Sequence, residues 1–384
     1  MRAPGEAIGT LTFETAIDEL AEKCGIDPVE FRLINEPQAD PTSGDDFASR
    51  RLIECIRTGA EKFGWSGRVK PGSRREGRKL IGHGMAVAIR PNTLSPASAE
   101  VSLTADGRLT ARLDMTDIGT GSYTILTQIA AETLSIPVDR ITMELGDSNF
   151  PTTAGSGGSF GAASSGSALF DACSNLRSAI SERLTQSGII ANSFVFKGDR
   201  VVAGEHDVAL AELVGDDGLK AEGSVDPDNH GNGKSEYSYG VQFAEVEVDA
   251  DTGELRVRRM AGVFDAGRIL NRKTARSQLM GGMIFGIGGA LLEESLVDDR
   301  YGSFMNRDFA EYHIAVNRDV PDLDVHMLDG YSKDSNPLGS KGIGELGICG
   351  AGPAIANAVY EATGVRVRKF PIHLEDVLDQ LPAL

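Results

Sequence analysis

The pattern of apolar and polar positions predicts two short helices at the start of the chain. Apolar residues recur at helical spacing in Ile17, Leu20, Ala21 and Cys24, so we expect a first helix that ends at Gly25. A second helix is expected from Asp27 to about residue 35, because Asp is a favourable N-cap and the following proline suits the first helical position.

Strands are predicted from about residue 81 onward. The dipeptide Asp106-Gly107 lies between two runs of strand-forming residues and is a strong hairpin signal. A later pair of strands is expected to be joined by a turn at residues 249–253. The predicted strands are 85–89, 99–104, 109–113, 141–145, 241–248 and 255–259.

Helical spacing returns between and after these strands, over residues 126–133, 169–184, 279–292 and 353–363. Strands and helices alternate without a uniform repeat, so the predicted fold class is mixed α/β. The segments 36–46 and 68–79 have the composition of loops. We therefore place a domain boundary near residue 75, with one domain ending there and a second spanning 76–384.

The charge balance argues against nucleic acid and membrane surfaces as partners. The 384 residues include 38 Lys and Arg against 56 Asp and Glu, a formal net charge of −18, which repels phosphate backbones and anionic lipid. No apolar run approaches the roughly 20 residues that span a bilayer. The segment MRAPGEAIGT lacks the features of a secretory signal, so a cytoplasmic location is expected.

The four cysteines predict no locally built metal centre. Cys24, Cys55, Cys173 and Cys349 form no CxxC pair and have no neighbouring histidines. Neither a zinc ribbon nor an iron–sulfur cluster is therefore expected on this chain. Cysteines this sparse also favour a reducing compartment over a disulfide framework.

Glycine is the unusual component of the composition, because it gathers in three loops. The first, residues 155–167 (GSGGSFGAASSGS), directly precedes a predicted helix. Glycine backbone can approach a ligand closely and present N–H groups beside a helix N-terminus, which is how proteins hold phosphates. The alternative is a flexible linker, although Phe160 and the helix behind it favour an anion cradle.

The other two glycine loops carry hydroxyls and one carboxylate. Residues 117–124 (DIGTGSYT) lead into a helix, and their hydroxyls either contact a ligand or cap that helix. Residues 341–347 (KGIGELG) place Glu345 among glycines, with Ile343 and Leu346 beside it. Apolar surroundings raise a carboxyl pKa and suit a general base. The alternative is an exposed loop glutamate.

Eight segments carry a resemblance to a known family. They are MRAPGEA, DELAEKCGIDPVEFR, DIGTGSYT, GSGGSFGAASSGSA, FAEVEVDADTGELRV, FDAGRILN, QLMGGMIFGIGGALLEE and KGIGELGICGAGPAIANA. In this order they cover nearly the whole chain. They resemble the molybdenum-binding subunit of the xanthine dehydrogenase and aldehyde oxidase family, most of all the bacterial aldehyde oxidoreductases with separate molybdenum, flavin and iron–sulfur subunits.

The resemblance implies an activity and its cofactors. Enzymes of this family oxidise aldehydes to carboxylic acids with oxygen from water. They use molybdopterin, in bacteria often as the cytosine dinucleotide, held by backbone amides of glycine loops without a protein ligand to the metal. Electrons leave through a [2Fe–2S] subunit and an FAD subunit. Xanthine or another N-heterocycle is the alternative substrate.

The resemblance also implies roles for individual residues. The family's general base falls on Glu345, and its arginine opposite the substrate pocket falls on Arg2. Arg90 is a further candidate for orienting substrate, the alternative being a surface arginine. The implied cofactor-binding residues are Gly119, Thr120, Gly121, Ser122, Thr124, Gly157, Gly158, Ser159, Phe160, Gly161, Ala162, Ala163, Ser165, Lys341, Gly342, Ile343 and Gly344.

Subunits of the family are longer than this chain, and the MRAPGEA segment lies near their middle. The resemblance therefore implies that residues 1–75 end a first molybdopterin-binding domain and 76–384 form a second. The missing N-terminal half is expected on another polypeptide, unless the coding unit is truncated.

A non-catalytic assembly piece is the alternative function of this chain. A signal on a partner subunit would carry the complex to the periplasm, the alternative to the cytoplasm.

Overall fold

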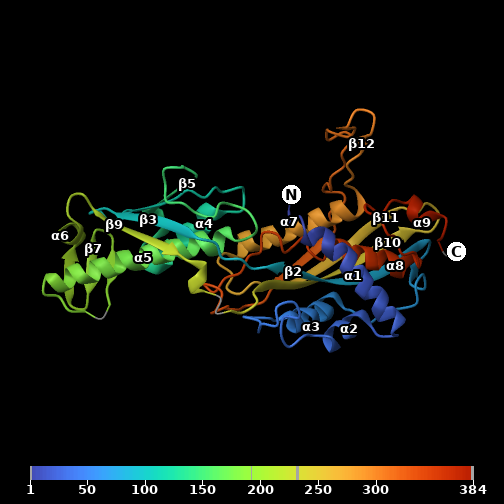
Figure 1. Cartoon of the computed structure of the whole chain (residues 1–384), viewed down its shortest axis with the longest axis horizontal. Coiled ribbons are helices and arrows are strands. Elements are labelled where there is room, and N and C mark those ends of the chain that lie inside the picture. Colours follow the sequence, from blue (N-terminus) through green and yellow to red (C-terminus); the bar gives the residue numbers. More distant parts are fainter. Residues whose placement is uncertain (1, 192, 231–232, 382–384) are drawn as a thin grey trace.

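The computed structural model describes residues 2–191, 193–230 and 233–381, and its two larger β-sheets lie toward opposite ends of an elongated molecule (Figure 1). No helix among the described residues is long and apolar enough to cross a membrane. The helices are α1 Glu6–Lys23, α2 Pro28–Ile34, α3 Leu52–Phe63, α4 Ser122–Leu134, α5 Gly161–Gln186, α6 Leu210–Val214, α7 Arg272–Leu291, α8 Ala351–Thr363 and α9 Glu375–Leu378.

A five-stranded sheet, with the order β1–β2–β10–β11–β14, forms the larger body. Its strands are β1 Arg75–Glu76, β2 Lys79–Pro91, β10 Tyr237–Asp249, β11 Leu255–Asp265 and β14 Asp322–Met327. Strand β10 is antiparallel to β2 and β11, and β14 is parallel to β11. Helices α7 and α8 cover one face and α3 covers the other, so an apolar core lies on each side of the sheet.

The close packing of α8 on β2 depends on glycine. A Cβ atom on Gly84 of β2 would lie 2.2 Å from the carbonyl oxygen of Ala354 in α8. The helix can therefore approach the strand only where the strand has no side chain. Helix α8 begins at Ala351, shortly after the third glycine loop, residues 341–347. This packing therefore fixes where that loop ends.

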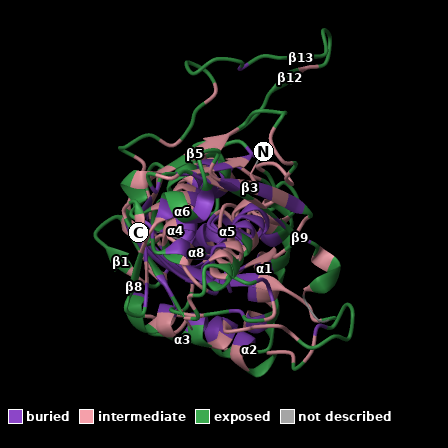
Figure 2. Cartoon of the chain, turned by 90° about the vertical axis from the view of Figure 1, so that its left-hand side faces the viewer, coloured by how far each residue is buried: buried purple, intermediate pink, exposed green. Residues whose placement is uncertain are grey.

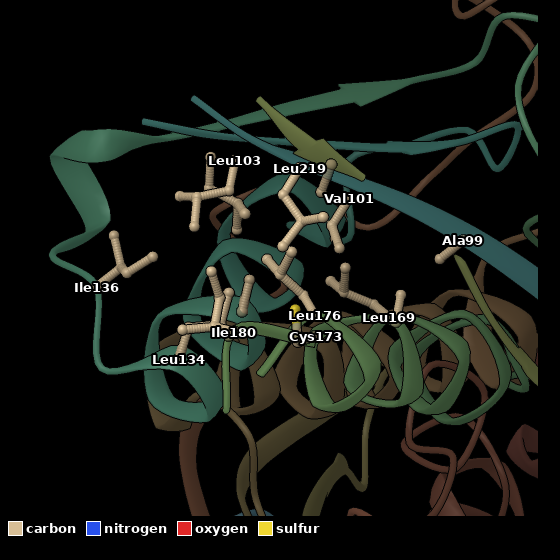
Figure 3. Close-up of a cluster of buried hydrophobic side chains, with 14 of the residues drawn as sticks. Ala99, Val101, Leu103, Leu134, Ile136, Leu169, Cys173, Leu176, Ile180 and Leu219 are labelled. Carbon is tan, nitrogen blue, oxygen red and sulfur yellow. The ribbon is translucent and has the colours of Figure 1, made fainter. Parts of the chain in front are cut away.

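A four-stranded sheet with the order β5–β4–β3–β9 forms the second body. Its strands are β3 Ala97–Leu103, β4 Leu109–Leu113, β5 Ile141–Leu145 and β9 Leu219–Val225. Helices α4 and α5 pack on this sheet, and Figure 3 shows Leu176 of α5 in one apolar cluster with Val101 and Leu219 of the strands. A small sheet of β6 Val195–Lys197, β7 Arg200–Ala203 and β8 His206–Ala209 follows α5.

Between α7 and β14 the chain leaves the body as an arm, residues 293–320. The arm contains the short hairpin of β12 Val297–Asp298 and β13 Ser303–Phe304. Figures 1 and 2 both show it standing out from the body on the side where the N-terminus lies, and Figure 2 shows it as mostly exposed. The arm was not predicted from the sequence.

Most predicted elements are confirmed, and so is the mixed α/β class. The β3–β4 hairpin turns at Asp106-Gly107, and the carboxylate of Asp27 accepts the N–H groups of Val29 and Glu30 at the start of α2. The boundary near residue 75 stays a prediction. Helix α3, before that boundary, packs on the same sheet as strands that come after it.

The helix predicted at the start of the chain is confirmed as α1, but the apolar spacing that predicted it describes its buried face only at Ala21. Leu20 is 46 % exposed, whereas Glu14 and Asp18 are buried. Glu14 accepts two hydrogen bonds from Arg32, and Asp18 accepts one from Arg68. Carboxylates can occupy a buried helix face when arginines compensate their charge and hydrogen bonds satisfy their oxygens.

The predicted extent of the glycine–serine loop is wrong, because α5 begins at Gly161 and the segment Ser164–Ser167 is helical and buried. A Cβ atom on Gly166 would lie 2.8 Å from the side chain of Leu338. Small residues here let the helix pack closely, whereas their composition alone suggests a flexible loop. The sequence also did not predict α3, β6–β9 or β14.

Candidate active site

A cavity of about 620 Å³ lies where the two bodies meet, and all three glycine loops contribute to its wall. The wall residues between 118 and 122, except Gly121, and between 156 and 162, except Phe160, come from the body that contains α4 and α5. The 340–345 loop and the N-terminal part of α7 come from the other body. The structure therefore brings the three glycine loops together in one wall.

Three helix N-termini face this cavity. Ser122 begins α4, Gly161 begins α5, and Asn271 is the N-cap of α7, and each of the three lines the wall. Helix N-termini carry partial positive charge and unpaired N–H groups. Within the described residues, the N–H groups of Gly157 and Gly158 donate to no protein acceptor. The cavity therefore suits a phosphate-bearing ligand.

The loop before α4 is organised by Asp117. Its carboxylate accepts the N–H groups of Gly119, Gly121 and Tyr123 at 2.8, 3.3 and 3.3 Å. Burial opposes ionisation of this carboxyl, but the backbone donors outweigh it and hold the pKa of Asp117 below its ordinary value. Asp117 therefore caps this helix, and Thr120 lines the cavity with its hydroxyl 3.2 Å from that of Ser122.

Glu345 lies at the cavity wall with its carboxylate held by four hydrogen bonds. Its Oε1 atom accepts the N–H of Ala3 at 2.9 Å. Its Oε2 atom accepts the Ser159 hydroxyl at 3.0 Å and two N–H groups of Arg90 at 2.7 and 2.9 Å. The side chain is 14 % exposed, so the alternative of an exposed loop glutamate is wrong.

The expected raised pKa of Glu345 is also wrong. Partial burial opposes ionisation, but the N–H of Ala3, the guanidinium of Arg90 and the hydroxyl of Ser159 together lower the pKa below its ordinary value. The prediction considered only the neighbours of Glu345 in sequence, whereas Arg90 lies 255 positions away.

Arg90 is not a surface arginine, because its side chain is 14 % exposed and connects two carboxylates. Its Nη1 atom donates to Glu6 Oε1 at 2.5 Å, while its Nε and Nη2 atoms donate to Glu345. Arg90 itself does not line the cavity. The geometry therefore makes Arg90 a residue that positions Glu345.

Arg2 lines the cavity beside the loop of Glu345. Its Nε atom donates to the carbonyl of Gly344 at 2.7 Å and its Nη2 atom to that of Gln278 at 2.6 Å. The guanidinium lies 5.7 Å from the ring centroid of Phe285 in α7. Burial lowers the pKa of Arg2, against the opposing effect of Glu345. Arg2 thus joins the N-terminal segment to α7 and to the third glycine loop.

Two residues that hold Glu345 adopt left-handed backbone. The φ angle is +48° at Ala3 and +63° at Ser159. For a residue with a side chain this conformation costs about 1–2 kcal/mol. Such strain persists where the surrounding structure fixes it, commonly at functional sites.

Polar side chains of β10, together with Asn92 directly after β2, hold the third glycine loop by hydrogen bonds. Asn92 Oδ1 accepts the N–H of Gly342 at 3.0 Å, and the Ser238 hydroxyl donates to its carbonyl at 2.7 Å. Gln242 donates to the carbonyl of Gly347 at 2.9 Å. None of these supports was predicted. A glutamine within an otherwise apolar strand segment was the sequence signal that could have identified them.

Lys341 contributes backbone to the cavity wall, but its ammonium group points elsewhere. The Nζ atom donates to Asp265 at 3.2 Å and to the carbonyl of Ser49 at 3.0 Å. Burial lowers its pKa although Asp265 opposes this effect. The lysine therefore anchors the loop and leaves its backbone to face the cavity.

The structure brings most of the predicted residues to the cavity wall. The wall contains Arg2, Gly119, Thr120, Ser122, Gly157, Gly158, Ser159, Gly161, Ala162, Lys341, Gly342, Ile343, Gly344 and Glu345. It does not contain Gly121, Thr124, Phe160, Ala163, Ser165 or Arg90. Ala163 and Ser165 lie on the buried side of α5. The roles of these residues toward a cofactor stay predictions.

Sequence reasoning missed the wall that residues 268–278 form. Arg268, Asn271, Thr274 and Gln278 are its polar members. The side chain of Asn271 accepts the N–H groups of Lys273 and Thr274, which caps α7. An asparagine directly before a helix is a recognisable N-cap signal, and it could have identified this third helix N-terminus.

The chain resembles molybdenum-binding proteins in sequence. Residues 58–321 and 1–36 match two models that are each described as a molybdopterin cofactor-binding domain. The chain is 49 % identical to the aldehyde oxidoreductase molybdenum-binding subunit PaoC of Escherichia coli K12, over all of this chain and 52 % of that subunit. It is 29 % identical to the putative xanthine dehydrogenase molybdenum-binding subunit XdhA of the same organism, over 97 % of this chain and 52 % of that protein.

Solved structures show the same arrangement. Quinoline 2-oxidoreductase from Pseudomonas putida 86 matches with a TM-score of 0.83 and 25 % identity, over 97 % of this chain and 52 % of that chain. The aldehyde oxidoreductase from Desulfovibrio gigas matches with a TM-score of 0.81 and 25 % identity, over 100 % of this chain and 42 % of that chain. The chain spans about half the length of the curated relatives it matches. The chain belongs to the molybdopterin cofactor-binding family of the aldehyde oxidoreductase and xanthine dehydrogenase molybdenum subunits.

Proposed function

We propose that this chain forms the C-terminal half of a molybdenum hydroxylase catalytic subunit that oxidises aldehydes to carboxylic acids with oxygen from water. One observation carries the proposal: a cavity bounded by three glycine loops and three helix N-termini has Glu345 in its wall. The 49 % identity to an aldehyde oxidoreductase subunit, against 29 % to a xanthine dehydrogenase subunit, supports an aldehyde over a purine.

The cofactor is molybdopterin, in its cytosine dinucleotide form. The unpaired N–H groups of Gly157 and Gly158 and the N-terminus of α5 are suited to its phosphates. Gly157 leaves open space where a Cβ atom would stand, so a ligand can approach the backbone closely. When bound, the cofactor supplies the two-electron oxidation.

Glu345 accepts the proton that the reaction releases, and Oε1 is the accepting atom. A carboxylate has about four lone-pair positions. Three hydrogen bonds arrive at Oε2, from Ser159 and Arg90, whereas among residues 2–191, 193–230 and 233–381 Ala3 alone donates to Oε1. Oε1 therefore keeps a lone pair free. The donors at Oε2 hold the group ionised and oriented before substrate arrives.

The remaining functions belong to partners. The four cysteines of this chain are unpaired, and three of them are buried in different parts of the fold, so the electrons pass to a [2Fe–2S] subunit and then to an FAD subunit. The other half of the molybdenum subunit closes the cavity. The assembled enzyme resides in the cytoplasm, where thiols stay reduced.

The test is reconstitution of the whole complex. The chain would be co-expressed with the N-terminal half, the iron–sulfur subunit and the FAD subunit. Molybdenum, released cytidine nucleotide, and oxidation of an aromatic aldehyde and of xanthine would then be measured. Molybdenum with aldehyde turnover supports the proposal, and xanthine turnover alone would replace it with the purine reaction. An assembled complex without molybdenum would instead support the alternative that this chain is a non-catalytic assembly piece.

A further inference from the structure

The arm at residues 293–320 carries an unusual concentration of exposed apolar side chains. Tyr301 is 78 % exposed and Phe309 is 85 % exposed. Further exposed members are Leu296, Val297, Phe304, Met305, Ile314 and Val316. Exposed apolar side chains that gather in one segment indicate a candidate interaction site.

The arm has internal structure and is not a loose loop. The carboxamide of buried Asn306 accepts the N–H of Leu296 and donates to the carbonyl of Glu294 at 2.5 Å, which ties the two sides of the arm together at its base. Tyr312 donates to Glu293 at 2.9 Å. The arm is therefore built to present its apolar side chains away from the body.

Further exposed apolar side chains lie on α7 and near the start of the chain. Helix α7 runs directly into the arm, and Phe285 on this helix is 52 % exposed at the cavity rim. Arg2 lies against Phe285, and Ile8 in the first turns of α1 is 63 % exposed. Figures 1 and 2 agree that the N-terminus and the arm lie on the same side of the molecule.

Residues 1–36 point to what covers this surface. They match a molybdopterin-binding model separate from the one that matches residues 58–321. In the described structure these residues form α1 and α2, which are too few elements to enclose a core of their own. In the relatives, this chain aligns with the C-terminal half, so the remaining half precedes Arg2. That position lies on the same side as the arm.

We infer that the arm is a clasp for the N-terminal half of the molybdenum subunit, which docks on the arm and on Phe285 and so covers the open side of the cavity. The inference deepens the proposed function, on which it rests for the identity of the partner. Aromatic side chains such as Tyr301 and Phe309 supply much apolar contact area for little conformational entropy, as is common at the centres of interfaces.

The test uses the full chain co-expressed with the N-terminal half of the 49 % identical Escherichia coli subunit. The variant is Tyr301→Ser with Phe309→Ser. The control is Val138→Ser with Ile190→Ser, whose side chains are also exposed, at 56 % and 87 %, but lie outside the arm. We expect the arm variant to weaken association at least about tenfold and the control to leave it unchanged. Thermal unfolding of the isolated arm variant should match that of the parent chain.

Cleavage by trypsin gives a second measurement. Arg300 and Arg307 lie in the arm, so the isolated chain should be cut there and the complex with the N-terminal half should be protected. No complex with the parent chain, equal affinity of the arm variant, or cleavage that the N-terminal half does not slow would each overturn the inference. So would a homodimer of this chain that the arm substitutions dissociate, since the partner would then be a second copy.

Molybdenum content and aldehyde oxidation of the same preparation separate this inference from the proposed function. If the two halves associate through the arm but bind no molybdenum, docking on the arm is supported and the proposed activity is contradicted. If molybdenum content and turnover are normal while the arm substitutions leave association intact, the proposed activity is supported and docking on the arm is contradicted.

Discussion

Ser159 and Glu345 hold each other by two hydrogen bonds across 186 positions of sequence. The Ser159 hydroxyl donates to Glu345 Oε2 and accepts the N–H of Glu345, each at 3.0 Å. The backbones also meet at this point, because a Cβ atom on Gly342 would lie 2.4 Å from the carbonyl oxygen of Ser159. The loop before α5 therefore sets the position of the carboxylate in the third glycine loop.

Two substitutions of Ser159 should separate the stability that its hydrogen bonds contribute from the stability that its backbone strain costs. Ser159→Ala removes a bond to a charged group, and we expect the free energy of unfolding to fall by about 1.5–3 kcal/mol. Ser159→Gly removes the same bonds but adopts the φ of +63° freely, so it should be about 1 kcal/mol more stable than the alanine variant. Urea unfolding measures both values. Equal stability of the two variants would contradict strain at this residue.

Glu345→Gln should preserve the site and abolish its proton transfer. Glutamine keeps the shape but cannot accept the proton, so turnover in the reconstituted complex should fall by on the order of 10²-fold or more. Molybdenum content should stay at the parent level, which elemental analysis would show. Glu205→Gln, an exposed position, is the matched control. Normal turnover of a molybdenum-replete Glu345→Gln complex would remove Glu345 from the mechanism.

The sequence predicts the elements better than the surfaces they bury. Hairpin and cap signals are local, so the β3–β4 turn at Gly107 and the Asp27 cap of α2 could be predicted. The buried face of α1 could not, because Glu14 lies inside only when Arg32 neutralises it. Such pairing depends on tertiary contacts that helical spacing does not describe.

The candidate site could likewise be predicted only in part. Glycine-rich composition located all three loops, and the cavity wall includes Gly119, Gly157 and Gly344. The partners of Glu345 could not be predicted, because Arg90 and Ala3 lie 255 and 342 positions away from it in the sequence. The direction of its pKa shift was consequently predicted with the wrong sign.

Removal of Arg90 should change the pH dependence of the reaction. Arg90 helps to lower the pKa of Glu345, so Arg90→Met raises that pKa. The base must be ionised to accept a proton, so the acid limb of the kcat/KM profile should move to higher pH. Arg90→Lys restores the positive charge but not the pair of hydrogen bonds to Glu345. It should therefore move the acid limb part of the way back toward its position in the parent enzyme. An acid limb that does not move in Arg90→Met would show that another group is the base.

A side chain at Gly157 should displace the cofactor while leaving the fold intact. Gly157 has no positive φ, and a Cβ atom there would meet nothing within 4 Å, so valine causes no strain within the protein. It would instead fill the space beside the unpaired N–H groups. We expect pterin and molybdenum content of Gly157→Val to fall at least about tenfold, and thermal unfolding of the isolated chain to stay unchanged. Gly9→Val, at an exposed position outside the cavity, is the control, and full cofactor retention in Gly157→Val would restore the linker interpretation.

Glu361 should make the stability of the chain depend on pH near neutrality. Burial in α8 raises its pKa to about 7, although Arg74 and Arg68 oppose this effect. The folded state therefore binds a proton that the unfolded state releases at its ordinary pKa of 4.5. Between these values, folding loses stability as the pH rises, by up to about 1.4 kcal/mol per pH unit.

Glu361→Gln removes this titration while its amide oxygen can still accept the N–H of His83. Its stability should exceed that of the parent above pH 7, and the difference between the two proteins should shrink steadily as the pH falls toward 4.5. Urea unfolding at intervals across this range measures the difference, with Glu375→Gln at an exposed position as control. A constant difference across the range would mean that Glu361 does not titrate there. A parent chain that gains stability with pH relative to Glu361→Gln would mean that Arg74 and Arg68 outweigh burial.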